Sequence, residues 1–146
     1  MTTKTPEQQA RELIDAKLSE SGWIVQDRAA MNIYAGLGVA VREFPLETGF
    51  ADYLLFVDGQ AVGVLEAKKV GFPLGGVTVQ ANLYSEGLPD TLDAPYRPLP
   101  FCYVSTGEVT RFTNQLDPKS RSRPIFQFHR PETLKEWIES ETLDHW

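Results

Sequence analysis

Apolar residues at helical spacing mark both ends of the chain. Residues 5–8 read Thr-Pro-Glu-Gln, which supplies a capping threonine, a proline at the first helical position and a glutamine that completes a capping box. Gly22 stands where a helix C-terminal cap is expected. Pro131 can open a second helix in the same way. The predicted apolar faces consist of Ala10, Leu13, Ile14 and Leu18 in the first helix and Leu134, Trp137 and Ile138 in the last.

Between these helices the chain carries short apolar runs separated by turn residues, which is the pattern of β-strands. Residues 50–57 and 61–67 flank Asp58-Gly59, a strong hairpin signal. Both runs are apolar on both faces, so we expect them in the centre of a sheet. A second hairpin is expected around Gly107. The other expected strands cover residues 23–25, 39–44, 101–105, 109–112 and 125–128.

A third helix is expected over residues 77–86, after a Gly/Pro-rich loop at 71–76 and before Gly87 and Pro89. Residues 88–100 contain four prolines and are expected to form a loop. Residues 26–36 are expected to be loop or irregular helix. The order of elements therefore predicts an α/β fold with a mixed central sheet flanked by helices.

Composition is that of an ordinary globular domain. The 146 residues, 42% hydrophobic and 23% charged, fit one domain with a real core. No apolar run approaches the roughly 20 residues that cross a bilayer, and the polar start is unlike a secretory signal. The single Cys102 cannot form an internal disulfide, and its apolar strand places it in the core. A reducing cytoplasm is the compartment we expect.

The net charge of −6 counts against a stand-alone nucleic-acid binder, because such proteins usually present a basic face. Two explanations would reconcile the charge with a function on DNA. The acidic residues could cluster where a cation binds, or partner domains could supply the basic surface.

The residues that interrupt the central strands are the best candidates for chemistry. Asp52 lies near the start of one apolar strand, and Glu66 and Lys68 end the next. Charges beside apolar strands are costly unless they are paired or bind metal. Two carboxylates suit Mg²⁺, and a lysine can hold the attacking water and stabilise the transition state. The alternative, of about equal weight from spacing alone, is an ion pair between Glu66 and Lys68 or Lys69.

The catalytic interpretation requires that the hairpin at Asp58-Gly59 place Asp52 and Glu66 on the same face of the sheet. Glu66 and Lys68 share a face because side chains alternate along a strand. A plain two-residue turn would pair Asp52 with Leu65 and put it on the opposite face. A three-residue loop closed by Gly59 in the left-handed conformation, or an equivalent bulge, would bring Asp52 to the face of Glu66.

Two further pairs are spaced four residues apart on predicted helices. Gln80 and Tyr84 could orient a water or contact DNA, although alone they are better explained as a helix-boundary pair. Glu7 and Arg11 in the first helix are better explained as an exposed ion pair than as site residues. The two histidines are far apart and suggest no zinc site, and the loop at 71–76 lacks the signature of a phosphate loop.

With Asp52, Glu66-Ala67-Lys68 and Gln80-x-x-x-Tyr84 in this order, the sequence resembles the N-terminal nuclease domain of the restriction (R) subunit of type I restriction–modification enzymes, of the PD-(D/E)xK superfamily. The Glu-Ala-Lys core is weak alone, whereas the ordered set is specific. Ala51 stands where the motif's name has a proline, a position that varies in such folds. The likeness covers nearly the whole chain and also includes residues 5–15, 22–23, 38–44, 51–59, 63–68 and 128–134.

The resemblance implies a restriction-endonuclease-like fold and roles for individual residues. Asp52 and Glu66 would bind Mg²⁺, Lys68 would assist hydrolysis, and Gln80 and Tyr84 would support cleavage. An acidic residue of the first helix often approaches the metal in such nucleases. Glu7 is the candidate here, with Glu12 left open.

The resemblance also implies a larger assembly. In the family, an ATP-driven DNA-translocating motor follows in the same subunit, and methylation and specificity subunits complete the enzyme that cuts double-stranded DNA. We therefore expect residues 1–146 to be a single nuclease domain, excised as an N-terminal fragment, with ATP used only by the full-length subunit and no membrane contact. The alternative is a non-catalytic domain that keeps the nuclease fold and docks onto the motor or onto DNA.

Overall fold

The computed structural model of the chain describes residues 3–47, 49–75 and 88–144. Helix α1 spans Pro6–Glu20, and helix α3 spans Pro131–Asp144. A short 3-10 helix, η1, covers Arg28–Ala30. The strands are β1 (Ile24–Asp27), β2 (Gly38–Leu46), β3 (Gly49–Val57), β4 (Gln60–Ala67), β5 (Phe101–Ser105), β6 (Thr110–Asn114) and β7 (Arg123–Ile125).

These strands form one seven-stranded sheet in the order β1-β2-β3-β4-β5-β6-β7. β1 pairs with β2 and β4 with β5 in parallel, and the other neighbours are antiparallel. The expected mixed sheet flanked by helices is confirmed, and the hairpin β3–β4 lies inside the sheet as its two-sided hydrophobicity predicts. The candidates Asp52 and Glu66 are therefore carried by two neighbouring strands in the centre of the sheet.

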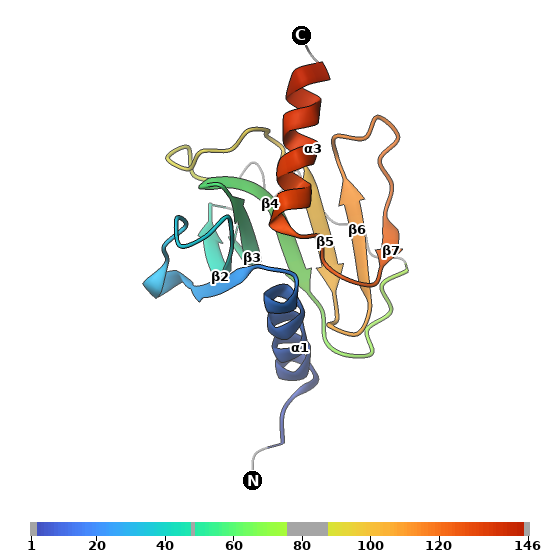
Figure 1. Cartoon of the computed structure of the whole chain (residues 1–146). Coiled ribbons are helices and arrows are strands. Elements are labelled where there is room, and N and C mark those ends of the chain that lie inside the picture. The colour runs from blue at the N-terminus through green and yellow to red at the C-terminus, as the bar shows by residue number, and fades with distance from the viewer. Residues whose placement is uncertain (1–2, 48, 76–87, 145–146) are drawn as a thin grey trace.

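Both described helices cover the same face of the sheet (Figure 1). Ile14 and Leu18 of α1 and Leu134 of α3 are fully buried against that face. Leu13, expected on the buried face of α1, is 38% exposed. On the opposite face, Leu88 and Leu99 from the loop after residue 87 pack on a second core cluster. The sheet is thus buried on both faces by apolar residues.

Local sequence signals agree with the structure at the helix ends. Thr5 accepts a hydrogen bond from the Gln8 amide at 3.2 Å and donates its own amide to the Gln8 side chain at 2.9 Å, so the capping box is formed. Gly22 follows α1 with a φ of 94°, the left-handed conformation expected after a helix. Cys102 is fully buried, and burial raises the pKa of its thiol to about 12.

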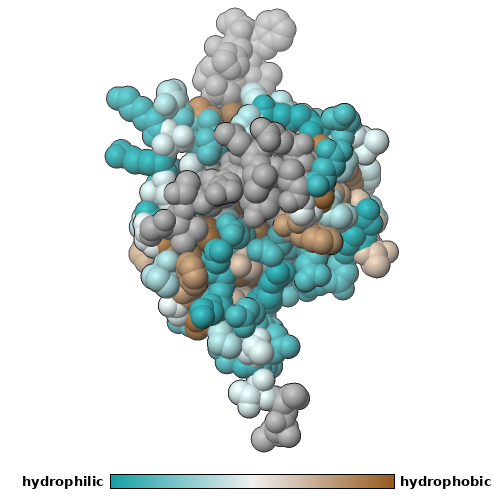
Figure 2. All heavy atoms as spheres, turned by 180° about the vertical axis from the view of Figure 1, so that it is seen from behind, coloured by the Kyte–Doolittle hydropathy of each residue, from teal (hydrophilic) through white to brown (hydrophobic). Residues whose placement is uncertain are grey.

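Two of the expected elements are not confirmed by the structure. The strand expected at residues 125–128 is wrong in its position, because β7 ends at Ile125 and the next residue, Phe126, is 100% exposed. The helix expected at residues 77–86 lies outside the described residues. Among the residues that the structure describes, no helix is long and apolar enough to cross a membrane. Seen from behind, the described surface is mostly hydrophilic (Figure 2).

His129 connects the end of the chain to the sheet. Its Nδ1 lies 2.7 Å from the Tyr103 hydroxyl, and its backbone carbonyl accepts a hydrogen bond from the Trp23 indole at 2.9 Å. The rings of Phe112 and Trp137 pack edge-on against it. Burial, and then the charge of Arg123, lower the pKa of His129 below its ordinary value of 6.5. The neutral imidazole is therefore the form that fits the folded protein.

This lowered pKa predicts a loss of stability in mild acid. The unfolded chain binds the His129 proton more tightly than the folded chain does, so the stability is fully present above about pH 6.5 and falls as the pH drops below it. Urea unfolding should show a lower free energy of unfolding at about pH 5.5 than at about pH 7.5. His129→Gln should be less stable at both values but should lose less between them. An equal loss in the variant would assign the acid sensitivity to other groups.

Candidate active site

Asp52 occupies the point where β3, β4 and α1 meet. Its Oδ2 accepts a hydrogen bond from the backbone amide of Ala67 at 2.7 Å, and its Oδ1 accepts one from the Arg11 guanidinium at 2.8 Å. Ala67 is the residue between Glu66 and Lys68. The Asp52 carboxylate is thus fixed directly beside the Glu-Ala-Lys segment, although the residues are separated by the hairpin.

The β3–β4 hairpin contains a bulge, which is one of the two geometries that the catalytic interpretation requires. Its turn has two residues, Asp58 with φ 53° and Gly59 with φ 78°, so the three-residue loop is wrong and the positive φ of Gly59 is confirmed. The register shifts between Leu55 and Phe56, because Leu55 pairs with Gly63 whereas Phe56 pairs with Ala61. Beyond the shift Tyr53 pairs with Leu65, and the next position in this register sets Asp52 opposite Glu66.

Glu66 and Lys68 form an ion pair at the end of β4. Lys68 Nζ lies 3.1 Å from Glu66 Oε1, and the side chains of Lys68 and Glu66 are 31% and 22% exposed. The Lys68 ammonium also lies 5.3 Å from the centre of the Phe72 ring. The ion pair considered as the alternative is therefore present. It lies at the end of central strand β4, next to β3, which carries Asp52.

The first helix supplies partners that sequence reasoning did not place in the site. The Arg11 guanidinium lies 5.5 Å from the centre of the Tyr53 ring and pairs with Asp52, not with Glu7. The Tyr53 hydroxyl donates to Asp15 Oδ1 at 2.6 Å. Burial, together with this bond to a carboxylate, raises the pKa of Tyr53 well above its ordinary value. Arg11 and Asp15, four residues apart, therefore face the sheet together.

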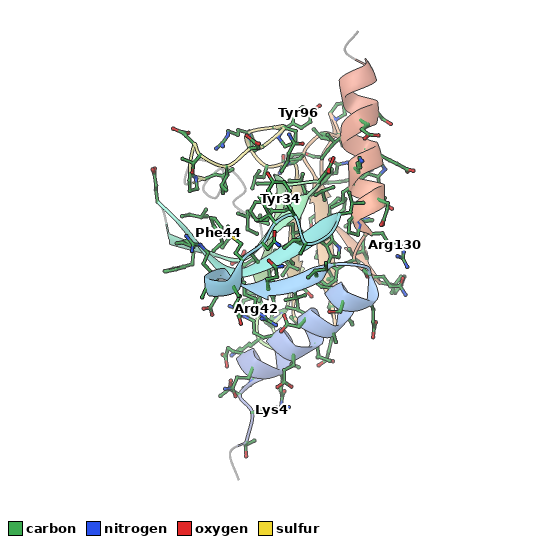
Figure 3. The ribbon with its side chains drawn as sticks, turned by 60° about the vertical axis from the view of Figure 1, so that its left-hand side comes forward. Lys4, Tyr34, Arg42, Phe44, Tyr96 and Arg130 are labelled. Atoms are coloured by element: carbon green, nitrogen blue, oxygen red, sulfur yellow. The ribbon has the colours of Figure 1, made fainter. Side chains whose placement is uncertain are left out.

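Arg42 of β2 joins the same network from the neighbouring strand. It pairs with Asp15 at 3.0 Å and with Asp27 at 2.8 Å. The hydrogen bond to Asp15 is the main reason that the pKa of Arg42 is raised above its ordinary value. Figure 3 shows Arg42 between the sheet and α1, with Lys4 near the beginning of that helix. The available signal was an arginine interrupting an otherwise apolar strand.

Glu43 adds an unusual backbone conformation next to Asp52. It stands between the pairs Arg42–Tyr53 and Phe44–Ala51, hence opposite Asp52, and its φ is 50°. A positive φ is uncommon for a residue other than glycine, and such conformations concentrate at functional sites. Nothing in the sequence pattern marked this position.

A surface groove runs along this region. It is lined by Arg11, Arg42 and Glu43 together with residues at the start of α1. A smaller depression beside it is lined by Glu7, Arg11, Ala67, Lys68 and Lys69.

Glu7 lines this depression together with Lys68, and its role as a metal ligand stays a prediction. The ion pairs formed by the described residues do not include Glu7. Glu12, the other candidate, pairs with Lys4 at 2.7 Å and is more than half exposed. Gln80 and Tyr84 lie outside the described residues.

The donor atoms at this centre fit a hard divalent cation. Asp52 and Glu66 offer carboxylate oxygens from neighbouring central strands, and Mg²⁺ commonly uses one or two carboxylates and completes its shell with water and phosphate oxygens. Among the described ranges, no cluster of three or more histidine, cysteine, aspartate or glutamate residues could hold a metal. A cation here would be held by Asp52 and Glu66, the two described carboxylates that the sequence analysis assigns to it.

Comparison with known proteins shows the family to which this chain belongs. Residues 30–138 match the family described as the second domain of the type I restriction enzyme EcoKI endonuclease subunit. The type I restriction enzyme EcoKI endonuclease subunit of Escherichia coli (strain K12) is 27% identical over an alignment that covers 96% of this chain. That alignment covers only 16% of the relative, so this chain spans about a sixth of its length.

A solved structure shows the same fold. A fragment of an HsdR subunit of a type I restriction enzyme from Vibrio vulnificus YJ016 superimposes with a TM-score of 0.69 and 20% identity. The superposition covers 97% of this chain and 26% of that one. The restriction-endonuclease-like α/β fold expected from the sequence is thereby confirmed.

Proposed function

Because this chain belongs to the family described as the second domain of the type I restriction enzyme EcoKI endonuclease subunit, we propose that it is the Mg²⁺-dependent nuclease domain of such a subunit. Asp52, Glu66 and Lys68 form its catalytic centre in this proposal. The observation that carries it is the 2.7 Å bond from the Ala67 amide to Asp52, which holds one carboxylate beside the segment bearing the other two groups.

Each residue has a distinct task in hydrolysing a DNA phosphodiester. Asp52 and Glu66 would hold Mg²⁺, which when bound lowers the pKa of a water and neutralises charge on the phosphate. Lys68 has its ammonium 3.1 Å from Glu66, so it can orient a water near that carboxylate and stabilise negative charge that develops on the phosphate. Ala67 fixes Asp52 through its amide, which keeps the Asp52 carboxylate from rotating away.

The wider assembly belongs to the proposal as well. The substrate is double-stranded DNA, and the partners are the motor region of the same subunit and the methylation and specificity subunits. These partners would supply the basic surface that a chain of net charge −6 does not provide. Glu7, which lines the depression with Lys68, is the first-helix carboxylate placed to approach the metal.

Mg²⁺ binding tests the proposed metal role. Calorimetric titration with Mg²⁺ should show binding to the unaltered chain and a loss of at least about tenfold in affinity for Asp52→Asn. The asparagine retains an oxygen for the Ala67 amide but loses the charge. Glu139→Gln, on the exposed side of α3, is the matched control and should bind like the unaltered chain. Equal binding by all three proteins would favour a non-catalytic docking domain instead.

Gln80 and Tyr84, which complete the motif of the resemblance, are proposed to support cleavage. Replacing either with alanine should reduce DNA cleavage less than loss of a metal-binding carboxylate does, because neither side chain carries the charge that neutralises Mg²⁺. Cleavage and thermal stability should be measured together for Gln80→Ala and Tyr84→Ala. Full cleavage by both would remove the pair from the site, and lost cleavage with collapsed stability would indicate a packing role.

A further inference from the structure

We infer that Arg11 competes with the divalent cation for Asp52, so that it is a positioning residue that holds this carboxylate in the metal-free protein and must leave when the metal binds. The inference rests on the proposed function and goes beyond it, because it gives a role to a residue that the nuclease motif does not include.

The two oxygens of Asp52 have different partners. Oδ2 is engaged by the Ala67 amide, which belongs to the backbone of β4 and cannot move without disturbing the sheet. Oδ1 is engaged by the Arg11 guanidinium at 2.8 Å, the end of a long flexible side chain. A cation that approaches Asp52 therefore meets the positive charge of Arg11 at the oxygen that is free to change partners.

Arg11 is held in this position by more than its charge. Its guanidinium lies over the Tyr53 ring, and Tyr53 is itself fixed by the hydrogen bond to Asp15. The pairing with Asp52 thus occurs in a supported geometry, with about 30% of each side chain exposed. An arginine in this position neutralises the Asp52 carboxylate until a divalent cation binds there.

The surface around Arg11 offers its side chain an alternative position. Its side chain lines the groove that contains Glu43 and the depression that contains Glu7, so a rotated guanidinium would meet other carboxylates and open solvent. In this groove it would also be able to contact a DNA phosphate. Metal binding at Asp52 and release of Arg11 into the groove are therefore coupled events.

The experiment compares two arginine variants of the full chain by titration with Mn²⁺ alone. Arg11→Gln should bind Mn²⁺ roughly three- to tenfold more tightly than the unaltered chain, the size expected when one partly exposed ion pair no longer competes. Arg111→Gln is the matched control. Arg111 lies on β6 and donates hydrogen bonds to Ser122, outside the network of Asp52 and Asp15. Its loss should change the affinity less than about twofold on this scale.

The gain must depend on Asp52. Adding Asp52→Asn to Arg11→Gln should remove the tighter binding. If the unaltered chain binds Mn²⁺ through Asp52 and Arg11→Gln binds equally or more weakly, the inference is overturned while the proposed function stands. If no protein binds Mn²⁺ in a way that depends on Asp52, both fall together.

A measurement on the unaltered chain covers the case in which Arg11→Gln does not fold. The side-chain Nε–H signal of Arg11 in an NMR spectrum should shift as Mg²⁺ is added, in proportion to the bound fraction, while the signal of Arg111, which donates to Ser122, stays in place. An Arg11 signal that does not move while Mg²⁺ binds would refute the competition.

Discussion

Replacing Asp52 or Glu66 by its amide, or Lys68 by alanine, should abolish DNA cleavage by a restriction complex that carries this domain. Each variant removes a charge that acts on the metal or the phosphate, and such losses reduce rates by on the order of a hundredfold or more. The amides keep the shape of the side chains, and the asparagine in Asp52→Asn can still accept the Ala67 amide, so the fold should survive. In the proposed assembly the motor is a separate region of the subunit, so ATP hydrolysis and translocation should persist.

The readout is the fraction of plasmid DNA cut with Mg²⁺ and ATP, with ATP hydrolysis measured in the same samples. Glu139→Gln, a change of equal charge on the exposed side of α3, should cut at the unaltered rate. Near-normal cleavage by any one of the three site variants would show that this residue lacks the role proposed for it.

The second large effect is expected from Gly63→Ala in the middle of β4. A Cβ atom at Gly63 would lie 2.5 Å from the carbonyl oxygen of Phe101 on β5 and 3.1 Å from its Cβ, and neither atom belongs to the movable end of a side chain. The two strands would have to separate, at a cost of about 1–3 kcal/mol. Because β4 carries Glu66 and Lys68 at its end, the displacement should also weaken cleavage.

Gly75→Ala is the matched control, since no atom of the described residues beyond its chain neighbours lies within 4 Å of the position its Cβ would take. Urea unfolding of the two variants gives the comparison. Equal free energies of unfolding would mean that the close approach of β4 and β5 at Gly63 is relieved without cost.

Sequence reasoning succeeded where the cause of the structure is local. The capping box at Thr5, the glycine after α1 and the Asp58-Gly59 turn depend on a few consecutive residues, so their patterns can be read directly. The central position of β3 and β4 followed from their two apolar faces. The assignment of Asp52, Glu66 and Lys68 as a catalytic centre rested on the family resemblance, because their spacing alone fits an ion pair equally well, and it stays a prediction.

Features set by contacts between distant segments were missed. The position of the bulge opposite Leu55 and Phe56 depends on how both strands pack. The sequence analysis required only a three-residue loop or a bulge somewhere in this hairpin. Arg11 was assigned to Glu7 four residues away, whereas its partner Asp52 lies 41 residues along the chain. Glu7 is exposed to water near the helix start, so a partly buried carboxylate on the sheet is the stronger partner for Arg11.

The central claim is that Asp52 and Glu66 bind one metal ion together, and crystals soaked with Mn²⁺ test it most directly through anomalous scattering. The account predicts a single strong peak within about 2.2 Å of an oxygen from each carboxylate. With Mn²⁺ at saturation, no peak between these residues, or a peak that contacts only one of them, would contradict it.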